Sequence, residues 1–137
     1  MPYPVSGTVV LGNRIGRTIG FPTVNLYPPE SKLLPPRGVY YSRVYCDKVW
    51  YPAISNIGCK PTVQTAGRIG LESYLYDFDR DVYGHEIEVE LLAFRRPEQR
   101  FADIEALKRQ LQEDIAAGAG YHGVPDAEYK KQVKFLL

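Results

Sequence analysis

The sequence predicts a mainly-β domain, either a closed antiparallel barrel or a sandwich, followed by a helix. Up to about Arg96, clusters drawn from the 12 Gly and 11 Pro separate short runs of β-forming residues, and beyond it the pattern becomes helical. Short strands with turns between them are typical of antiparallel sheets, whereas a parallel sheet needs helices between its strands. With 137 residues and 45% hydrophobic content, the chain is expected to be one domain, with a core over residues 5–118.

Five runs rich in Val, Ile, Tyr and Leu are expected to be strands: residues 6–11, 38–45, 49–54, 71–78 and 87–94. Asp47-Lys48 separates the second run from the third and predicts a tight hairpin turn. The last run alternates at its start and is apolar at its end, so one end should be half-exposed and the other buried.

The C-terminal helix has clear local signals. Asp103 can cap it and Glu105 suits its positive end, while apolar residues recur at helical spacing on one face (Ile104, Leu107, Leu111 and Ile115). Gly118 and Gly120 are expected to end this helix. Residues 121–137 form a tail, in which a short helix is expected from Asp126 to about Phe135.

Charge and composition exclude several classes of protein. Seventeen basic and sixteen acidic residues leave a net charge of +1, which argues against a basic nucleic-acid surface and a polybasic membrane anchor. No apolar run approaches the roughly 18–20 residues of a membrane span, and the first residues lack the pattern of a signal peptide, so none is expected. Cys46 and Cys59 lack a partner motif, and His85 and His122 are expected at the surface, so no zinc site is predicted. These observations favour a cytoplasmic protein.

The densest functional signal is a glycine-rich segment with Gly12, Gly16 and Gly20 at four-residue spacing and Arg17 among them. Such loops hold phosphate oxygens, because glycine lets backbone N–H groups approach closely. The segment misses the Walker A pattern by one residue of spacing and has Arg-Thr where Lys-Ser/Thr is required. An ordinary hairpin loop with solvated arginines is the alternative.

Thr23 and Asn25 follow this segment and alternate, so both side chains should point to one side of an extended chain. A hydroxyl and an amide carbonyl are hard neutral ligands that Mg²⁺ accepts beside phosphate oxygens. A strand Thr and an Asn bonded within a local turn are the alternative.

Glu72 lies among apolar and aromatic residues and is expected to share a strand face with Tyr74 and Tyr76. A partly desolvated carboxylate has a raised pKa and suits work as a general base. A surface glutamate is the alternative.

The residues from Gly12 to Asn25 resemble the glycine-rich loop and Pro-Thr-Ala-Asn signature of riboflavin kinases of the bacterial and eukaryotic type. Further landmarks of that family follow in order: Gly38-Val39-Tyr40, the run from Asn56 to Thr62, Glu72 leading into Asp77-Phe78, Tyr83-Gly84, and Arg96-Pro97-Glu98 with Phe101. The resemblance covers about residues 3–118. Val24 stands where the signature has Ala and is expected to pack into the barrel.

The resemblance implies a six-stranded antiparallel Greek-key β-barrel with a C-terminal α-helix, and transfer of the ATP γ-phosphoryl group to riboflavin, giving FMN. It implies that Thr23 and Asn25 hold Mg²⁺, that Gly12, Gly16, Arg17 and Gly20 cover the phosphates, that Glu72 is the catalytic base, and that Arg96 and Phe101 lie at the flavin.

The residues from Pro2 to Gly7 resemble the junction that follows the adenylyltransferase domain in bifunctional bacterial FAD synthetases. The chain is therefore expected to be either a stand-alone kinase or the kinase domain of a longer protein, with an adenylyltransferase domain as its partner. The alternatives are a flavin- or nucleotide-binding regulatory module without turnover and, from another class, a barrel that binds nucleic acid, against which the neutral charge argues.

Overall fold

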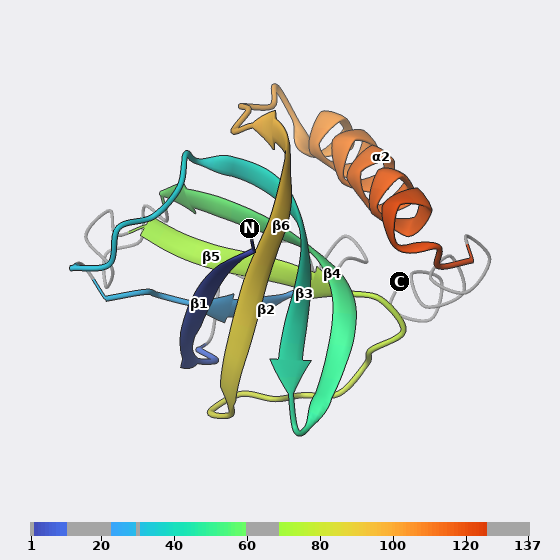
Figure 1. Cartoon of the computed structure of the whole chain (residues 1–137). Helices are drawn as coiled ribbons and strands as arrows, with labels where there is room; N and C mark the ends of the chain where they lie inside the picture. The colour runs from blue at the N-terminus through green and yellow to red at the C-terminus, as the bar shows by residue number, and fades with distance from the viewer. Residues whose placement is uncertain (1, 11–22, 30, 60–68, 126–137) are drawn as a thin grey trace.

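The computed structural model describes residues 2–10, 23–29, 31–59 and 69–125. One antiparallel sheet of six strands curls into a partly closed barrel, and one helix lies outside it (Figure 1). Its elements are β1 (Tyr3–Thr8), β2 (Val24–Leu26), β3 (Gly38–Cys46), β4 (Val49–Cys59), β5 (Ile69–Leu75), β6 (Glu86–Pro97) and α2 (Ile104–His122).

The strand order β1-β6-β3-β4-β5-β2 is a Greek key, as the family resemblance implied. Strands β3, β4 and β5 follow one another in the chain and in the sheet, and β6 returns to pair with β3, which is the defining connection of that motif. The two edge strands approach at an antiparallel bridge between Val10 and Asn25, where the Val10 amide donates to the Asn25 carbonyl over 2.8 Å.

The five predicted strands are present, with different bounds. Strand β1 begins at Tyr3 and includes Pro4. Proline has no N–H to donate, which an edge strand tolerates because only one of its sides is paired. Strand β4 continues beyond residue 54 because Ser55 is buried on the inner face and bonds to Ser42, 2.7 Å away. The predicted turn at Asp47-Lys48 is confirmed, since both residues have the positive φ of a two-residue hairpin, 50° and 71°.

The concave face of the sheet holds the main core, built from alternate residues of the strands such as Val44, Ile57, Leu71 and Val89. A second apolar cluster lies on the outer face, where Val39, Ile54, Tyr74 and Tyr76 pack against Ile115 and Ala119 of α2. The main core therefore fills the concave face, whereas α2 covers only part of the outer face.

Helix α2 begins where the sequence predicts, with the Asp103 side chain accepting from the Ala106 amide over 2.8 Å. The predicted end at Gly118 and Gly120 is wrong: the helix continues to His122 and ends at Gly123, which has the left-handed φ of 70°. Gly118 is a packing residue, because a Cβ there would lie 2.6 Å from Cγ1 of Ile54.

Two other expectations for this region need correction. Ile104 is 51% exposed and does not share the buried face of α2, because the helix only reaches the sheet further along its length. His122 is half-buried, with Nε2 2.9 Å from the Ala53 carbonyl, because the helix extends far enough to bring it onto β4. The predicted helix over residues 126–135 lies outside the described residues. Among those described, no helix is long and apolar enough to cross a membrane.

Candidate active site

The register of three strands brings two predicted site residues side by side. Asn25 on β2 is the cross-strand partner of Glu72 on β5, and Glu72 is in turn the partner of Asn56 on β4. Direct partners in an antiparallel pair have Cβ atoms about 4.5–5.5 Å apart and project from the same face. The three side chains, each half-buried, therefore form a continuous polar row on the outer face.

Thr23 lies two residues before Asn25, directly ahead of β2, and is also half-buried. Of the predicted phosphate-covering residues, Gly12, Gly16, Arg17 and Gly20 lie outside the described residues. The residues on either side of that segment are described, however, and the Val10–Asn25 bridge places them beside the polar row. Val10 and Thr23, the described residues nearest to that segment in the chain, therefore lie near Asn25, the cross-strand partner of Glu72.

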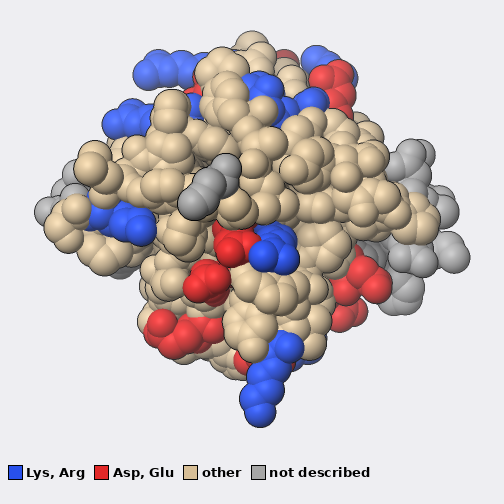
Figure 2. Space-filling model, in the orientation of Figure 1, with Lys and Arg blue, Asp and Glu red and all other residues tan. Residues whose placement is uncertain are grey.

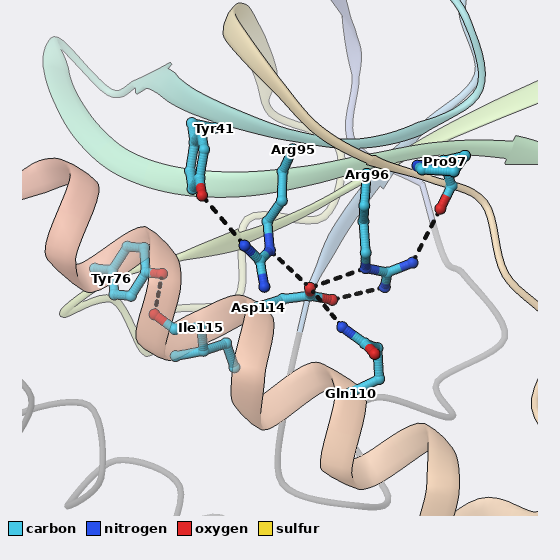
Figure 3. Close-up of polar contacts among 8 residues, drawn as sticks. All are labelled: Tyr41, Tyr76, Arg95, Arg96, Pro97, Gln110, Asp114 and Ile115. Atoms are coloured by element: carbon cyan, nitrogen blue, oxygen red, sulfur yellow. Dashed lines mark hydrogen bonds and ion pairs between the residues drawn. The ribbon is translucent and has the colours of Figure 1, made fainter.

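Arg96, predicted to lie at the flavin, takes part in a partly buried cluster with α2 (Figure 3). Its Nε and Nη2 donate to the Asp114 carboxylate over 2.9 and 2.7 Å, and its Nη1 donates to the Pro97 carbonyl over 3.1 Å. Arg95 Nε donates to the same carboxylate over 3.0 Å, and Gln110 Nε2 does so over 3.1 Å. We call these four residues, Arg95, Arg96, Gln110 and Asp114, the Asp114 cluster.

A β-bulge explains how two successive arginines reach one carboxylate. Neighbouring residues of a regular strand point to opposite faces, but here Val39 pairs with Arg96 and Tyr40 with Phe94, so Arg95 is the extra residue. Burial alone would lower the Arg95 pKa, but its hydrogen bonds to Asp114 and Tyr41 raise it above the ordinary value. The bulge fixes the end of β6, from which the chain continues to Glu98 and Phe101.

Phe101 is half-buried between the end of β6 and the cap of α2. The structure brings Asn25 and Glu72 together at one place on the outer face, and it secures Arg96 between β6 and α2. Two residues of this region received no role from the sequence. Asn56 was noted only as the first residue of a family landmark, the run from Asn56 to Thr62. Asp114 carried no signal, because charged residues on helices are usually solvated.

Cys46, Asp47 and His85 also gather, at the far end of the β3–β4 hairpin, with their ligand atoms within 4.8 Å of one another. Here the Asp47 carboxylate is already bonded to His85 and Arg80, each over 3.0 Å, and these bonds, that to His85 foremost, lower its pKa. An ion pair with a permanent cation accounts for the cluster, and His85 is exposed as predicted.

Comparison with known proteins shows the family to which this chain belongs. The family model described as flavokinase, or riboflavin kinase, matches residues 1–121. The chain belongs to the riboflavin kinase family. The family is the one whose landmarks the sequence carries, and its Greek-key barrel with a C-terminal helix is the fold observed.

The bifunctional riboflavin kinase/FMN adenylyltransferase of Escherichia coli strain K12 is 42% identical over 125 residues, covering 90% of this chain and 39% of that protein. A crystal structure described as a macrolide-efflux protein from Streptococcus pneumoniae has a TM-score of 0.76 and 34% identity, covering 85% of this chain and 38% of that one.

The riboflavin kinase of Trypanosoma brucei shares the fold, with a TM-score of 0.62 and 22% identity over 90% of this chain and 82% of that one. The chain spans only 36–49% of the length of the curated relatives that it matches first.

Proposed function

We propose that this chain is a riboflavin kinase, which transfers the γ-phosphoryl group of ATP to the 5′-hydroxyl of riboflavin and releases FMN and ADP. The observation that carries the proposal is the row in which Glu72 lies between Asn25 and Asn56, with Thr23 two residues before Asn25 and Val10 bridged to it. A member of the riboflavin kinase family with these residues retained has the groups that the reaction needs.

Phosphoryl transfer depends mainly on positioning the substrates and stabilising the phosphate charge. The 5′-oxygen of riboflavin forms a bond to the γ-phosphorus while the bond between that phosphorus and the β–γ bridging oxygen breaks. In this proposal the Glu72 carboxylate accepts the proton of the attacking hydroxyl. Its cross-strand neighbours are neutral amides, whose N–H groups can donate hydrogen bonds to a carboxylate.

Thr23 and Asn25 are suited to hold Mg²⁺. Both are half-buried and close together in the chain, and they offer neutral oxygen atoms beside a site for phosphates, which is the ligand type that Mg²⁺ takes together with phosphates and water. When bound, the ion would neutralise phosphate charge. We therefore expect Asn25→Ala to weaken productive binding of MgATP, measured as a rise in KM across a series of Mg²⁺ concentrations.

The relatives named bifunctional carry a second activity, and this chain matches well under half of their length. We propose only the kinase reaction for it, with adenylylation of FMN left to an adenylyltransferase domain or protein as partner. We place the activity in the cytoplasm, which supplies ATP. Neither Cys46 nor Cys59 forms a disulfide, which suits a reducing compartment.

The test is a product assay with riboflavin and MgATP, followed by chromatography of FMN. The wild-type chain is expected to form FMN, and Glu72→Gln is expected to lower kcat by about 10²–10⁴, the usual contribution of a general base, with little change in flavin affinity. Glu88→Gln, which removes a carboxylate from β6 of the same sheet, is the matched control.

A wild-type chain that binds riboflavin and MgATP without forming FMN would instead be a regulatory binding module. Full activity in Glu72→Gln would remove Glu72 from the role of base.

A further inference from the structure

Glu98 is an exposed residue whose backbone lies directly after the end of β6. It follows Pro97, the last residue of β6, where the Asp114 cluster ties the strand to α2. From there its side chain lies over Gly58 of β4: a Cβ at Gly58 would overlap Oε1 of Glu98. The carboxylate thus occupies the space that a side chain at position 58 would fill.

This carboxylate borders the polar row. Gly58 lies two residues from Asn56 along β4, so both belong to the outer face, and the same hypothetical Cβ would be 3.6 Å from Nδ2 of Asn56. The cross-strand partner of Gly58 is Gly70 on β5. A rung of two glycines therefore adjoins the rung of Asn56 and Glu72, about 7 Å further along the strands.

The two glycines, both buried, add no side chain to the outer face between Glu72 and Glu98. Among the described residues, no hydrogen bond or ion pair engages the Glu98 carboxylate or the Asn56 amide group. Polar groups without a partner in the described part of the chain, at the border of a candidate base, are suited to a ligand with several hydroxyl groups.

We propose that Glu98, with Asn56 beside it, binds the inner hydroxyl groups of the polyol chain of the flavin substrate and so selects a flavin that carries this chain. The inference rests on the proposed function. With the terminal hydroxyl at Glu72, inner hydroxyl groups of the same chain would come within reach of Asn56, the cross-strand partner of Glu72, and of Glu98 beside it. A carboxylate accepts hydrogen bonds from hydroxyl groups, and such charge-assisted bonds are stronger than neutral ones.

The experiment compares two flavins, riboflavin and lumiflavin, which share the ring system but differ in that lumiflavin has no polyol chain. Their dissociation constants are measured by quenching of flavin fluorescence. Glu98→Gln is expected to weaken riboflavin binding about tenfold, which corresponds to ~1.4 kcal/mol, and to leave lumiflavin binding unchanged. The exposed Glu113→Gln on α2 is the matched control and should change neither.

Gly58→Ala provides an independent test, because its methyl group displaces the Glu98 carboxylate without removing it. It should reproduce the selective loss of riboflavin affinity, with a raised KM for riboflavin and an unchanged KM for MgATP. Thermal melting of each variant shows whether it is folded, and Glu98→Gln alone decides the question if Gly58→Ala does not fold.

Riboflavin affinity of Glu98→Gln within twofold of wild type, or an equal loss for lumiflavin, would overturn the proposal. So would wild-type protein that binds the two flavins equally well. The two proposals can fail separately. If the wild-type chain binds riboflavin more tightly than lumiflavin, loses this preference in Glu98→Gln and forms no FMN, the kinase function is refuted and the polyol site is supported.

Discussion

Replacing Asp114 by alanine is expected to destabilise the domain strongly, because the carboxylate connects α2 to the end of β6. Its side chain is only 2% exposed, and it accepts hydrogen bonds from Arg95, Arg96 and Gln110. The substitution would leave two guanidinium groups without their counter-ion in a partly dry environment, where their side chains are 23% and 17% exposed.

Breaking a buried pair from one side typically costs 3–5 kcal/mol. Because both arginines keep some contact with water, the lower end applies, so we expect the free energy of unfolding to fall by about 3 kcal/mol. At ~4 °C per kcal/mol for a domain of this size, the melting temperature should fall by about 12 °C. Urea and thermal unfolding, followed by circular dichroism, measure both quantities.

Glu113→Ala is the matched control, since it removes a carboxylate from the adjacent, exposed position of the same helix. It should change stability by no more than about 0.5 kcal/mol. A double-mutant cycle of Asp114→Ala with Arg96→Ala should show a coupling energy above ~1 kcal/mol. The reasoning is refuted if Asp114→Ala resembles Glu113→Ala, or if the cycle shows no coupling.

Three further predictions concern stability. Gly118→Ala should destabilise the fold because its methyl group would overlap side chains packed on the helix, whereas Gly120→Ala, with open space around it, should stabilise the fold by up to about 1 kcal/mol; equal effects in thermal melts would contradict this. Ser55→Ala should cost about 1–3 kcal/mol in urea unfolding, since it leaves two buried hydroxyl groups without their partner; an unchanged midpoint would show that those groups pair elsewhere. The pKa of Asp47 is lowered, first by the hydrogen bond from His85, so its stabilising contribution is present above the ordinary value of 3.8 and is lost as the pH falls below it. The stability difference between wild type and Asp47→Asn should therefore shrink on acidification, and a difference that does not depend on pH would contradict the assignment.

Local signals predicted local structure well. Asp103 caps the helix as its residue type and position indicate, and Asp47-Lys48 forms the hairpin turn. In both cases the residue types at and beside the position determine the backbone conformation. The end of α2 was predicted wrongly for the same reason: Gly118 resembles a helix stop in isolation, but here its missing side chain makes room for Tyr76 and Ile54.

The candidate site could be predicted only in part. Residue types and spacing singled out Asn25 and Glu72, and the register places them together. The contribution of Asn56 depends on a pairing between strands, and that of Asp114 on a β-bulge that turns two arginines to one side. Neither a register nor a bulge is encoded in the spacing of residues along one strand, because both are properties of paired strands.

A serine chain inside the barrel explains how the register beneath the site is maintained. Ser55 of β4 is bonded to Ser42 of β3 over 2.7 Å and to Ser73 of β5 over 2.6 Å, and all three hydroxyl groups are buried. Side chains alternate between the faces of a strand, so a slip of one residue would bring Glu72 into the core and expose Ser73. Such a slip would break the serine hydrogen bonds and bury a carboxylate, both of which are unfavourable. The inner serines thus hold β4 and β5 in the alignment that puts Glu72 on the outer face, and the site depends on core residues that no substrate touches.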